Sequence, residues 1–110
     1  MNEALQNLKN RMIADYYDWQ SASAIRTEVH ARMLDEYIDG IEIVEGRKYI
    51  KVIQNRSVWG FIVATDGDAK FSKGDILMAA GCNGPARNKA RGNVFDLENT
   101  RVQWTGANYL

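Results

Sequence analysis

The sequence has few of the residues that most often carry catalysis. Among its 110 residues there are one cysteine, Cys82, one histidine, His30, and one proline. A single cysteine excludes a disulfide within the chain. A lone histidine in an expected helix lacks the further ligands of a metal site and the partners of a catalytic triad. Cys82 stands near three cations, which can activate a thiol, but no histidine is close to it in the sequence. We therefore expect no enzymatic activity, no metal and no cofactor.

The sequence also lacks a net charge and a long apolar run. Lys and Arg together number 14, as do Asp and Glu, so no field of one sign draws the whole molecule to nucleic acid or to an anionic membrane. No apolar stretch is long enough to cross a bilayer, and none resembles a secretory leader. We expect a cytosolic protein with no membrane partner. If the protein is viral, that compartment is the host cytoplasm.

What the sequence does contain is typical of one folded domain over residues 1–110. Hydrophobic residues make up 45% of it and aromatic residues 10%, which is enough for a modest core. A small domain keeps a large surface relative to its volume, so some apolar surface is left for a partner. We expect a homo-oligomer. The large aromatic residues expected mostly in the core are Tyr16, Tyr17, Trp19, Trp59, Phe61 and Trp104.

Residues 1–40 predict two amphipathic helices. Apolar residues recur at steps of three and four over 5–19 and again over 25–37, which places each set on one helical stripe. The hydroxyl groups of "SAS" at 21–23 can cap a new helix, and Gly40 offers the second helix its end.

From residue 41 the hydrophobic period changes from about 3.6 to 2. Residues 41–43 alternate, and runs rich in β-branched and aromatic residues follow, separated by the turn sequences "QNRS", "DGD" and "KGD". The predicted strands are 49–53, 58–65, 76–80 and 100–105, the last an edge or closing strand with Val102 and Trp104 on one face. Helices followed by strands indicate an α+β fold, with two N-terminal helices (1–40) and an antiparallel β-meander of about four strands (41–110).

The segment "GCNGPARNKARGN", residues 81–93, is the least suited to packing, and we call it the basic loop. It has three glycines, three asparagines, three cations and no acid. Glycine lets the backbone approach a ligand closely, while Arg and Lys donate charge-assisted hydrogen bonds to phosphate or carboxylate oxygens. The residues predicted to bind such an anion are Arg87, Lys89, Arg91, Asn93, Gly84 and Gly92. An exposed aromatic ring beside them could also stack a base.

A plain solvated connection is the alternative interpretation of the basic loop. Its glycine spacing fits neither a Walker A loop nor a dinucleotide fingerprint. A structureless connection of thirteen residues is, however, unusually long for a compact domain. The acidic residues match no calcium loop and are interpreted as solvated faces and turns. They are Asp35, Glu36, Asp39, Glu42, Glu45, Asp66, Asp68 and Asp75.

From Arg47 onward, the text "RKYIKVI…SVWGFIVATDGDAKFSKGDILMAAGCNGPARNKARGNVFD" resembles a family of short hypothetical proteins encoded by tailed bacteriophages. The family pattern is a Gly-Asp turn followed by "K-A-A-S-W-K-A-P-A-K-x-A-R-G-N-I/V-F". The matching positions are Gly74, Asp75, Ala79, Ala80, Pro85, Ala86, Ala90, Arg91, Gly92, Asn93 and Phe95. Gly81-Cys82 replaces the usual Ser-Trp, which removes a possible stacking residue, and Arg87 replaces the second Lys. The resemblance covers about half of the chain and implies a phage accessory protein that acts in an infected bacterium, in a family with no settled activity.

These observations lead to two functional hypotheses. In the first, the protein is a non-enzymatic binding module whose basic loop holds a phosphate-bearing ligand, either a nucleotide or a nucleic acid. One version for the phage setting is a homo-oligomeric sponge that sequesters a host nucleotide signal as a counter-defence. In the second, the protein has an interaction or structural role and contacts an acidic host or virion protein.

Overall fold

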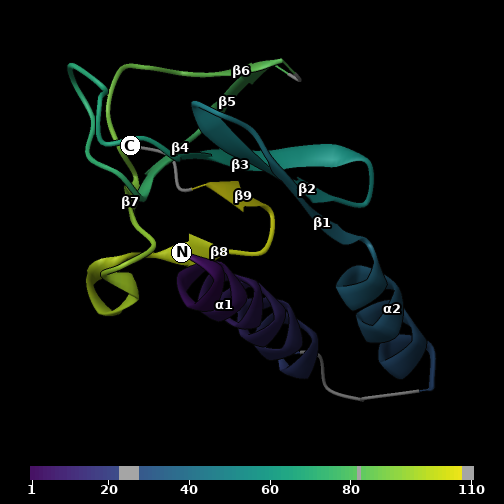
Figure 1. Ribbon diagram of the computed structural model, residues 1–110. Helices are drawn as coiled ribbons and strands as arrows, with labels where there is room; N and C mark the ends of the chain where they lie inside the picture. The colour runs from purple at the N-terminus through teal and green to yellow at the C-terminus, as the bar shows by residue number, and fades with distance from the viewer. Residues whose placement is uncertain (23–27, 82, 108–110) are drawn as a thin grey trace.

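The computed structural model describes residues 1–22, 28–81 and 83–107, and it confirms the α+β class (Figure 1). The elements are α1 (Asn2–Ser21), α2 (Glu28–Asp39), β1 (Ile41–Glu45), β2 (Tyr49–Gln54), β3 (Ser57–Val63), β4 (Asp75–Leu77), β5 (Ala79–Gly81), β6 (Gly84–Pro85), β7 (Gly92–Asn93), a 3-10 helix (Leu97–Asn99), β8 (Val102–Gln103) and β9 (Gly106–Ala107). Of the two serines expected to cap the second helix, Ser21 is the last residue of α1. Ser23 lies outside the described residues, as do Ile25, the first residue of the expected apolar stripe, and Cys82.

Five strands form one antiparallel sheet in the order β1-β2-β3-β4-β7. The first four follow one another along the chain, which confirms the predicted four-strand meander. The β2–β3 hairpin turns at Asn55 and Arg56, whose φ angles of 50° and 69° are the left-handed values of a two-residue hairpin turn. β7 comes from the end of the basic loop and adds a short fifth strand beside β4.

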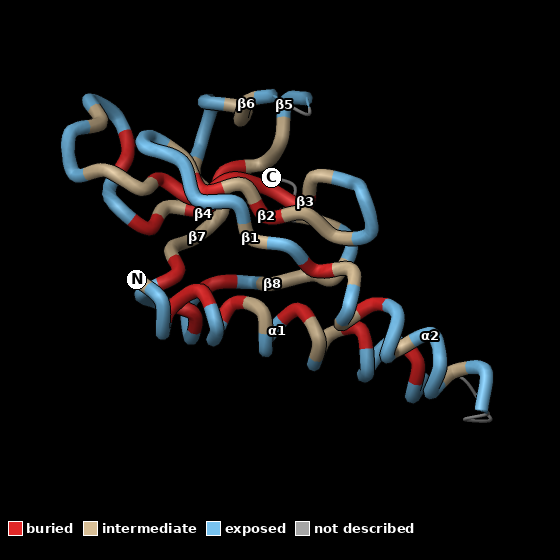
Figure 2. The backbone as a smooth tube through the Cα atoms, turned by 45° about the vertical axis from the view of Figure 1, so that its right-hand side comes forward, coloured by how far each residue is buried: buried red, intermediate tan, exposed pale blue. Residues whose placement is uncertain are grey.

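The sheet buries apolar side chains on both faces, because alternate residues of each strand point to opposite sides. On one face, Val52 and Ile62 belong to a core cluster with Leu8 and Met12 of α1, which are 1% and 0% exposed. Figure 2 shows α1 running along this side of the sheet with its buried turns facing it. Full burial of one such side chain contributes about 1.5–3 kcal/mol. The cluster on the other face consists of Phe61, Val63, Phe71 and Leu77.

α2 extends beyond the sheet, and the molecule measures 48 × 26 × 25 Å (Figures 1 and 2). Among its described residues only Tyr37 is buried, while Val29 and Met33, on the two preceding turns, are 51% and 36% exposed. Tyr17 and Trp19 of α1 are also exposed, at 42% and 51%, so these two of the six aromatic residues expected mostly in the core lie outside it. Val29 and Met33 thus leave apolar surface of α2 exposed.

The predicted closing strand at 100–105 is wrong in its length and in its partner. β8 covers two of these residues and pairs with β9 in a separate hairpin instead of joining the sheet. Trp104 falls in the turn between them. The alternation over 100–105 predicts a strand of six residues. In the structure the strand ends after two residues, because the chain turns back at 104–105 into β9.

Side chains from three other elements fix this C-terminal hairpin. Nε1 of Trp59 donates to the carbonyl oxygen of Gln103 at 2.7 Å, and the hydroxyl of Tyr37 donates to that of Trp104 at 3.2 Å. The amide of Trp104 donates to a carboxylate oxygen of Asp15 at 2.8 Å. The hairpin therefore ties β3, α2 and α1 together.

Candidate anion-binding site

The basic loop is folded onto the domain. β5 and β6 form a small hairpin around its start, and β7 pairs with β4 at its end. Between them, the amides of Ala86 and Arg91 donate to the carbonyl oxygens of Met78 and Ile76, both at 2.7 Å. The segment is therefore not the structureless connection that its composition indicated, because backbone hydrogen bonds hold both of its ends.

Arg87 forms the one salt bridge found in the described part of the chain. Its Nη1 and Nη2 donate to the two carboxylate oxygens of Asp68, each at 2.9 Å, and Nη1 also donates to the hydroxyl of Tyr49. The side chain of Asp68 is 1% exposed and that of Arg87 is 37% exposed. This two-bond geometry orients the guanidinium as well as neutralising the carboxylate.

Asp68 is stabilised in its ionised form by its surroundings. The Arg87 guanidinium is the main cause, and the amides of Lys70 and Phe71 add hydrogen bonds of 2.8 and 2.9 Å. Together they hold the pKa of the Asp68 carboxyl well below its usual range. The same pairing, with the Tyr49 hydroxyl, raises the pKa of Arg87.

Lys70 and Phe71 hold the middle of the basic loop in place. Nζ of Lys70 donates to the carbonyl oxygens of Arg87 and Asn88 at 2.6 and 3.0 Å. The Phe71 ring centre lies 5.0 Å from the guanidinium carbon of Arg87 and 5.4 Å from Nζ of Lys70, within cation–π range. Arg87 is thus fixed by an ion pair, a phenol and an aromatic ring.

Three cations from two separate segments line one pocket of about 370 Å³ beside this ion pair. Arg47 and Lys48 come from the β1–β2 turn and are exposed, and Arg87 comes from the basic loop. We call it the basic pocket; its lining residues are Arg47, Lys48, Thr65, Gly67, Asp68, Ala69 and Arg87. Because Asp68 is neutralised by Arg87, the two remaining cations give the pocket a net positive charge. Its volume lies in the range of about 300–1,000 Å³ typical of ligand pockets.

The other predicted cation with a fixed position, Arg91, holds the basic loop together. Its Nη1 donates to Oδ1 of Asn88 at 3.1 Å and to the carbonyl oxygen of Lys89, and Nη2 lies 3.7 Å from the sulfur of Met78. These contacts bend the side chain back onto its own segment. Arg91 does not line the basic pocket.

Gly92 and Asn93 serve the fifth strand. Gly92 has a φ of 149°, and a Cβ there would lie 2.3 Å from Cγ2 of Thr100, so no other residue fits without a shift. Nδ2 of Asn93 donates to the carbonyl oxygen of Lys73 at 3.1 Å and to Oδ1 of Asp75 at 3.0 Å. Both residues therefore stabilise the position of β7 in the fold.

Lys89 and Gly84 lie elsewhere on the surface. Lys89 is exposed, and, apart from its chain neighbours, no atom of the described residues lies within 4 Å of a Cβ built on Gly84. Of the six residues predicted from the sequence, the structure places Arg87 alone in the basic pocket. Arg47 and Lys48 were missed, although the "GRK" at 46–48, between two alternating runs, was a readable signal of a basic hairpin turn.

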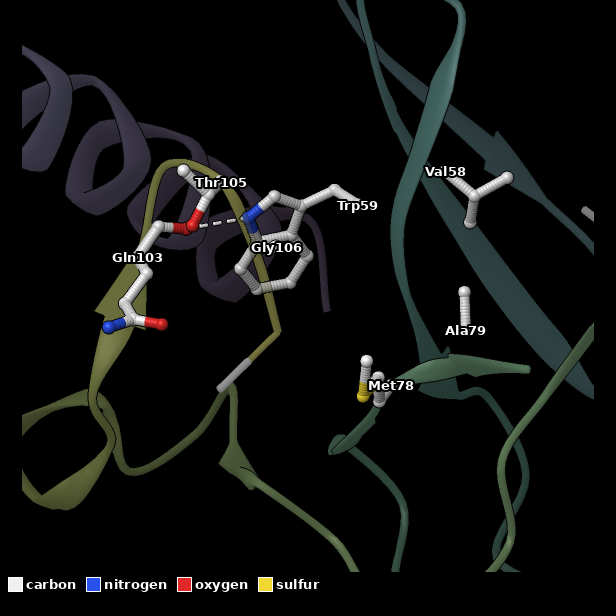
Figure 3. Close-up of a pocket in the computed structure, with 7 residues that line it drawn as sticks. All are labelled: Val58, Trp59, Met78, Ala79, Gln103, Thr105 and Gly106. Carbon is white, nitrogen blue, oxygen red and sulfur yellow. Dashed lines mark hydrogen bonds between the residues drawn. The ribbon is translucent and has the colours of Figure 1, made fainter. Parts of the chain in front are cut away.

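Another hollow, of about 230 Å³, lies between β3 and the C-terminal hairpin (Figure 3). Trp59 and Thr105 stand on one side of it and Met78 on the other, with the indole N–H turned to the Gln103 carbonyl. None of the described residues that line it is ionisable. Those residues therefore offer neither a counter-ion to an anionic ligand nor a group for acid–base chemistry.

In residues 1–22, 28–81 and 83–107, no three His, Cys, Asp or Glu side chains come together in a way that could hold a metal ion. Nor is any helix there both long enough and apolar enough to cross a membrane. No protein-family model matches the chain, and no curated protein or solved structure is significantly similar to it.

Proposed function

We propose that the protein is a non-enzymatic binding module that holds a phosphate-bearing ligand, a nucleotide or a nucleic acid backbone, in the basic pocket. The observation that carries this proposal is the convergence of Arg47, Lys48 and Arg87 on one pocket whose carboxylate already pairs with Arg87. Phosphate oxygens accept charge-assisted hydrogen bonds from such cations.

The side chain of Arg87 is already held in one position before a ligand binds. A guanidinium has five N–H donors, and Asp68 and Tyr49 accept from three of those of Arg87. One donor on Nη2 and the one on Nε are left without a hydrogen-bond partner among the described residues. Because the group is already held, a ligand that uses these donors gains their hydrogen bonds at little cost in side-chain entropy.

Arg47 and Lys48 supply the remaining charge and are less constrained. Both are exposed, and Nζ of Lys48 lies 5.4 Å from the ring centre of Tyr49. Exposed cations act through water and are screened by salt. The proposed binding is therefore strongest at low ionic strength.

The phage resemblance gives the proposal a setting. In that setting the protein acts in the host cytoplasm as an accessory protein, and its phosphate-bearing ligand is a host nucleotide signal that a homo-oligomer sequesters. Native mass spectrometry of protein purified from infected cells tests this version, because it reports copy number and retained small molecules together. A monomer that carries no phosphorylated compound would contradict it.

Calorimetric titration at low salt tests the pocket itself, with pyrophosphate, ATP and a single-stranded oligonucleotide as probes. We expect at least one probe to bind, and Arg47→Ala or Lys48→Ala to weaken its affinity about five- to tenfold. Arg32→Ala is the matched control, because Arg32 is an equally charged, exposed residue on α2. If no probe binds, or if the pocket and control variants lose the same affinity, the proposal is wrong.

A protein-interaction or structural role is the second candidate, favoured by one specific observation. Trp19, Val29 and Met33 expose apolar surface on the two helices, and single chains rarely leave large apolar patches uncovered. In this role the protein contacts a host or virion protein, with the basic loop facing its acidic groups. A pull-down from infected cells that recovers one stoichiometric protein and no nucleotide would favour this candidate over the first.

A further inference from the structure

A groove of about 540 Å³ separates α1 from the segment that follows β7. One wall carries Asn7, Asn10 and Arg11 of α1, and the other carries Phe95 and Glu98. The groove shares no lining residue with the basic pocket. It runs along α1 from Asn7 to Ala14, and the 3-10 helix that precedes β8 contributes Leu97 and Glu98 to its lining. Figure 1 shows that 3-10 helix beside the first turns of α1.

Phe95 is an exposed aromatic residue that the fold holds in position. It is 57% exposed, yet its amide donates to Oδ1 of Asn93 at 2.8 Å. Its ring lies so close to Gly74 that a Cβ there would be 2.6 Å from the ring Cδ2. Gly74 has a φ of 91°, which also favours glycine at this position. The ring is thus a pre-positioned apolar surface that faces solvent and not the core.

The facing wall is polar, and most of its hydrogen-bonding groups have no partner among the described residues. Asn7, Asn10 and Arg11 are spaced three and four residues apart, so they share the outer face of α1. Within the described residues, the side chains of Asn7 and Arg11 make no hydrogen bond, and Asn10 uses its Oδ1 to accept from Gln6 at 3.0 Å. Amide and guanidinium donors therefore stand opposite an aromatic ring across an open groove.

We propose that this groove binds a nucleobase, stacked on Phe95 and hydrogen-bonded along its edge by the α1 side chains. A base has a π-face for an aromatic platform and an edge that carries both donors and acceptors. Asn side chains pair with such mixed edges, Arg with acceptor pairs, and a carboxylate such as that of Glu98 with amino groups. An aliphatic peptide side chain would cover the ring but leave these polar groups without partners.

The charge balance separates this site from the basic pocket. Arg11 and Glu98 contribute opposite charges to the groove, whereas the basic pocket is net positive. The groove is thus matched to the uncharged base and not to phosphate. The proposal does not depend on the phosphate site, although a nucleotide contains both a base and a phosphate.

Uncharged nucleosides are the probes that distinguish the two sites. Adenosine, guanosine, cytidine and uridine are titrated into ¹⁵N-labelled full-length protein, and amide shifts are followed. We expect saturable shifts centred on Asn7, Asn10 and Phe95 with at least one nucleoside. Phe95→Ala should weaken that binding about fivefold or more while leaving pyrophosphate binding unchanged. Arg47→Ala should have the opposite pattern, so the failure of one site is distinguishable from the failure of the other.

One control variant and one variant of the polar wall complete the test. Trp19→Ala removes another exposed aromatic residue, at 51% exposure, and should leave nucleoside binding unchanged. Asn7→Ala alters the polar wall without touching the ring and should change the preference among the four nucleosides. The proposal is overturned if no nucleoside saturates the groove, if Phe95→Ala binds as well as the unmodified protein, or if a hydrophobic peptide occupies the groove more tightly than any nucleoside.

Discussion

Asp68 and Arg87, 19 residues apart in the chain, form an ion pair through two parallel hydrogen bonds of 2.9 Å. The carboxylate is 1% exposed, and it also accepts two backbone amides. The pair joins the turn at 66–68 to the basic loop. It therefore decides both where the loop lies and how the guanidinium is presented to the basic pocket.

This pair predicts a specific loss of stability in acid. The pKa of Asp68 is lowered in the folded protein, while an unfolded Asp titrates near about 3.9. A lowered folded pKa means that the contribution is complete above about pH 5 and is lost as the pH falls through 3.9 towards the folded value. Thermal unfolding from pH 7 to pH 3 should show this loss, and Asp68→Asn should flatten it. Asp66→Asn, a change at an exposed neighbour, should retain the slope of the unmodified protein.

Gly92 and Gly84, both predicted as ligand contacts, should respond differently to alanine. At Gly92 a Cβ meets Thr100 at 2.3 Å and the φ is 149°, whereas at Gly84 a Cβ meets no atom within 4 Å in the described part of the chain beyond its two neighbours. We expect Gly92→Ala to lower the free energy of unfolding by about 1–3 kcal/mol. Gly84→Ala should change it by less than about 0.5 kcal/mol. Urea denaturation measures both, and equal effects would contradict the close packing of β7 on Thr100.

Tyr37 predicts a loss of stability in alkali. Burial, and to a lesser degree the nearby Asp15 carboxylate, raises the pKa of Tyr37 well above the usual value for tyrosine. An unfolded tyrosine ionises near about pH 10. Above this pH, ionisation of Tyr37 stabilises the unfolded state, whereas in the folded state the hydroxyl stays protonated to a higher pH. The stability contribution is therefore complete below pH 10 and falls as the pH rises beyond it.

Tyr37→Phe should make unfolding less dependent on pH above 10, at the cost of one hydrogen bond at neutral pH. That bond, to the Trp104 carbonyl oxygen, is worth about 0.5–1.5 kcal/mol. Tyr17→Phe is the control, since Tyr17 is 42% exposed. The same alkaline slope in both variants would show that Tyr37 is not the residue responsible.

The parts of the fold that follow from local patterns were predictable from the sequence. The 3.6-residue period of α1 and the β-branched and aromatic runs of β2 and β3 are visible in short windows of the sequence, because each depends on residues that are close together in the chain. The C-terminal hairpin was not predictable in this way. Its anchors on Asp15, Tyr37 and Trp59 lie 89, 67 and 44 residues from the backbone groups that they bind. Such contacts exist only after the chain has folded.

The candidate site, too, was predictable from the sequence only where it depends on neighbouring residues. The basic loop was visible as a run of cations without acids, and Arg87 was among its predicted ligands. Which cations share a pocket depends on the packing of the β1–β2 turn, the 65–69 turn and the loop, which are distant in sequence. Composition also could not show that Arg91 and Asn93 would be used to hold the loop itself.

Salt dependence should separate the basic pocket from the rest of the basic loop. For a single-stranded nucleic acid, each neutralised phosphate adds about 0.7 to the slope of log affinity against log salt. If Arg47 and Lys48 each contact a phosphate, the double change to Ala should reduce the slope by about 1.4. Lys89→Ala removes an exposed loop cation outside the pocket and should leave the slope unchanged. A reduced slope in Lys89→Ala, with none in the double variant, would move the binding surface from the pocket to the solvent side of the loop.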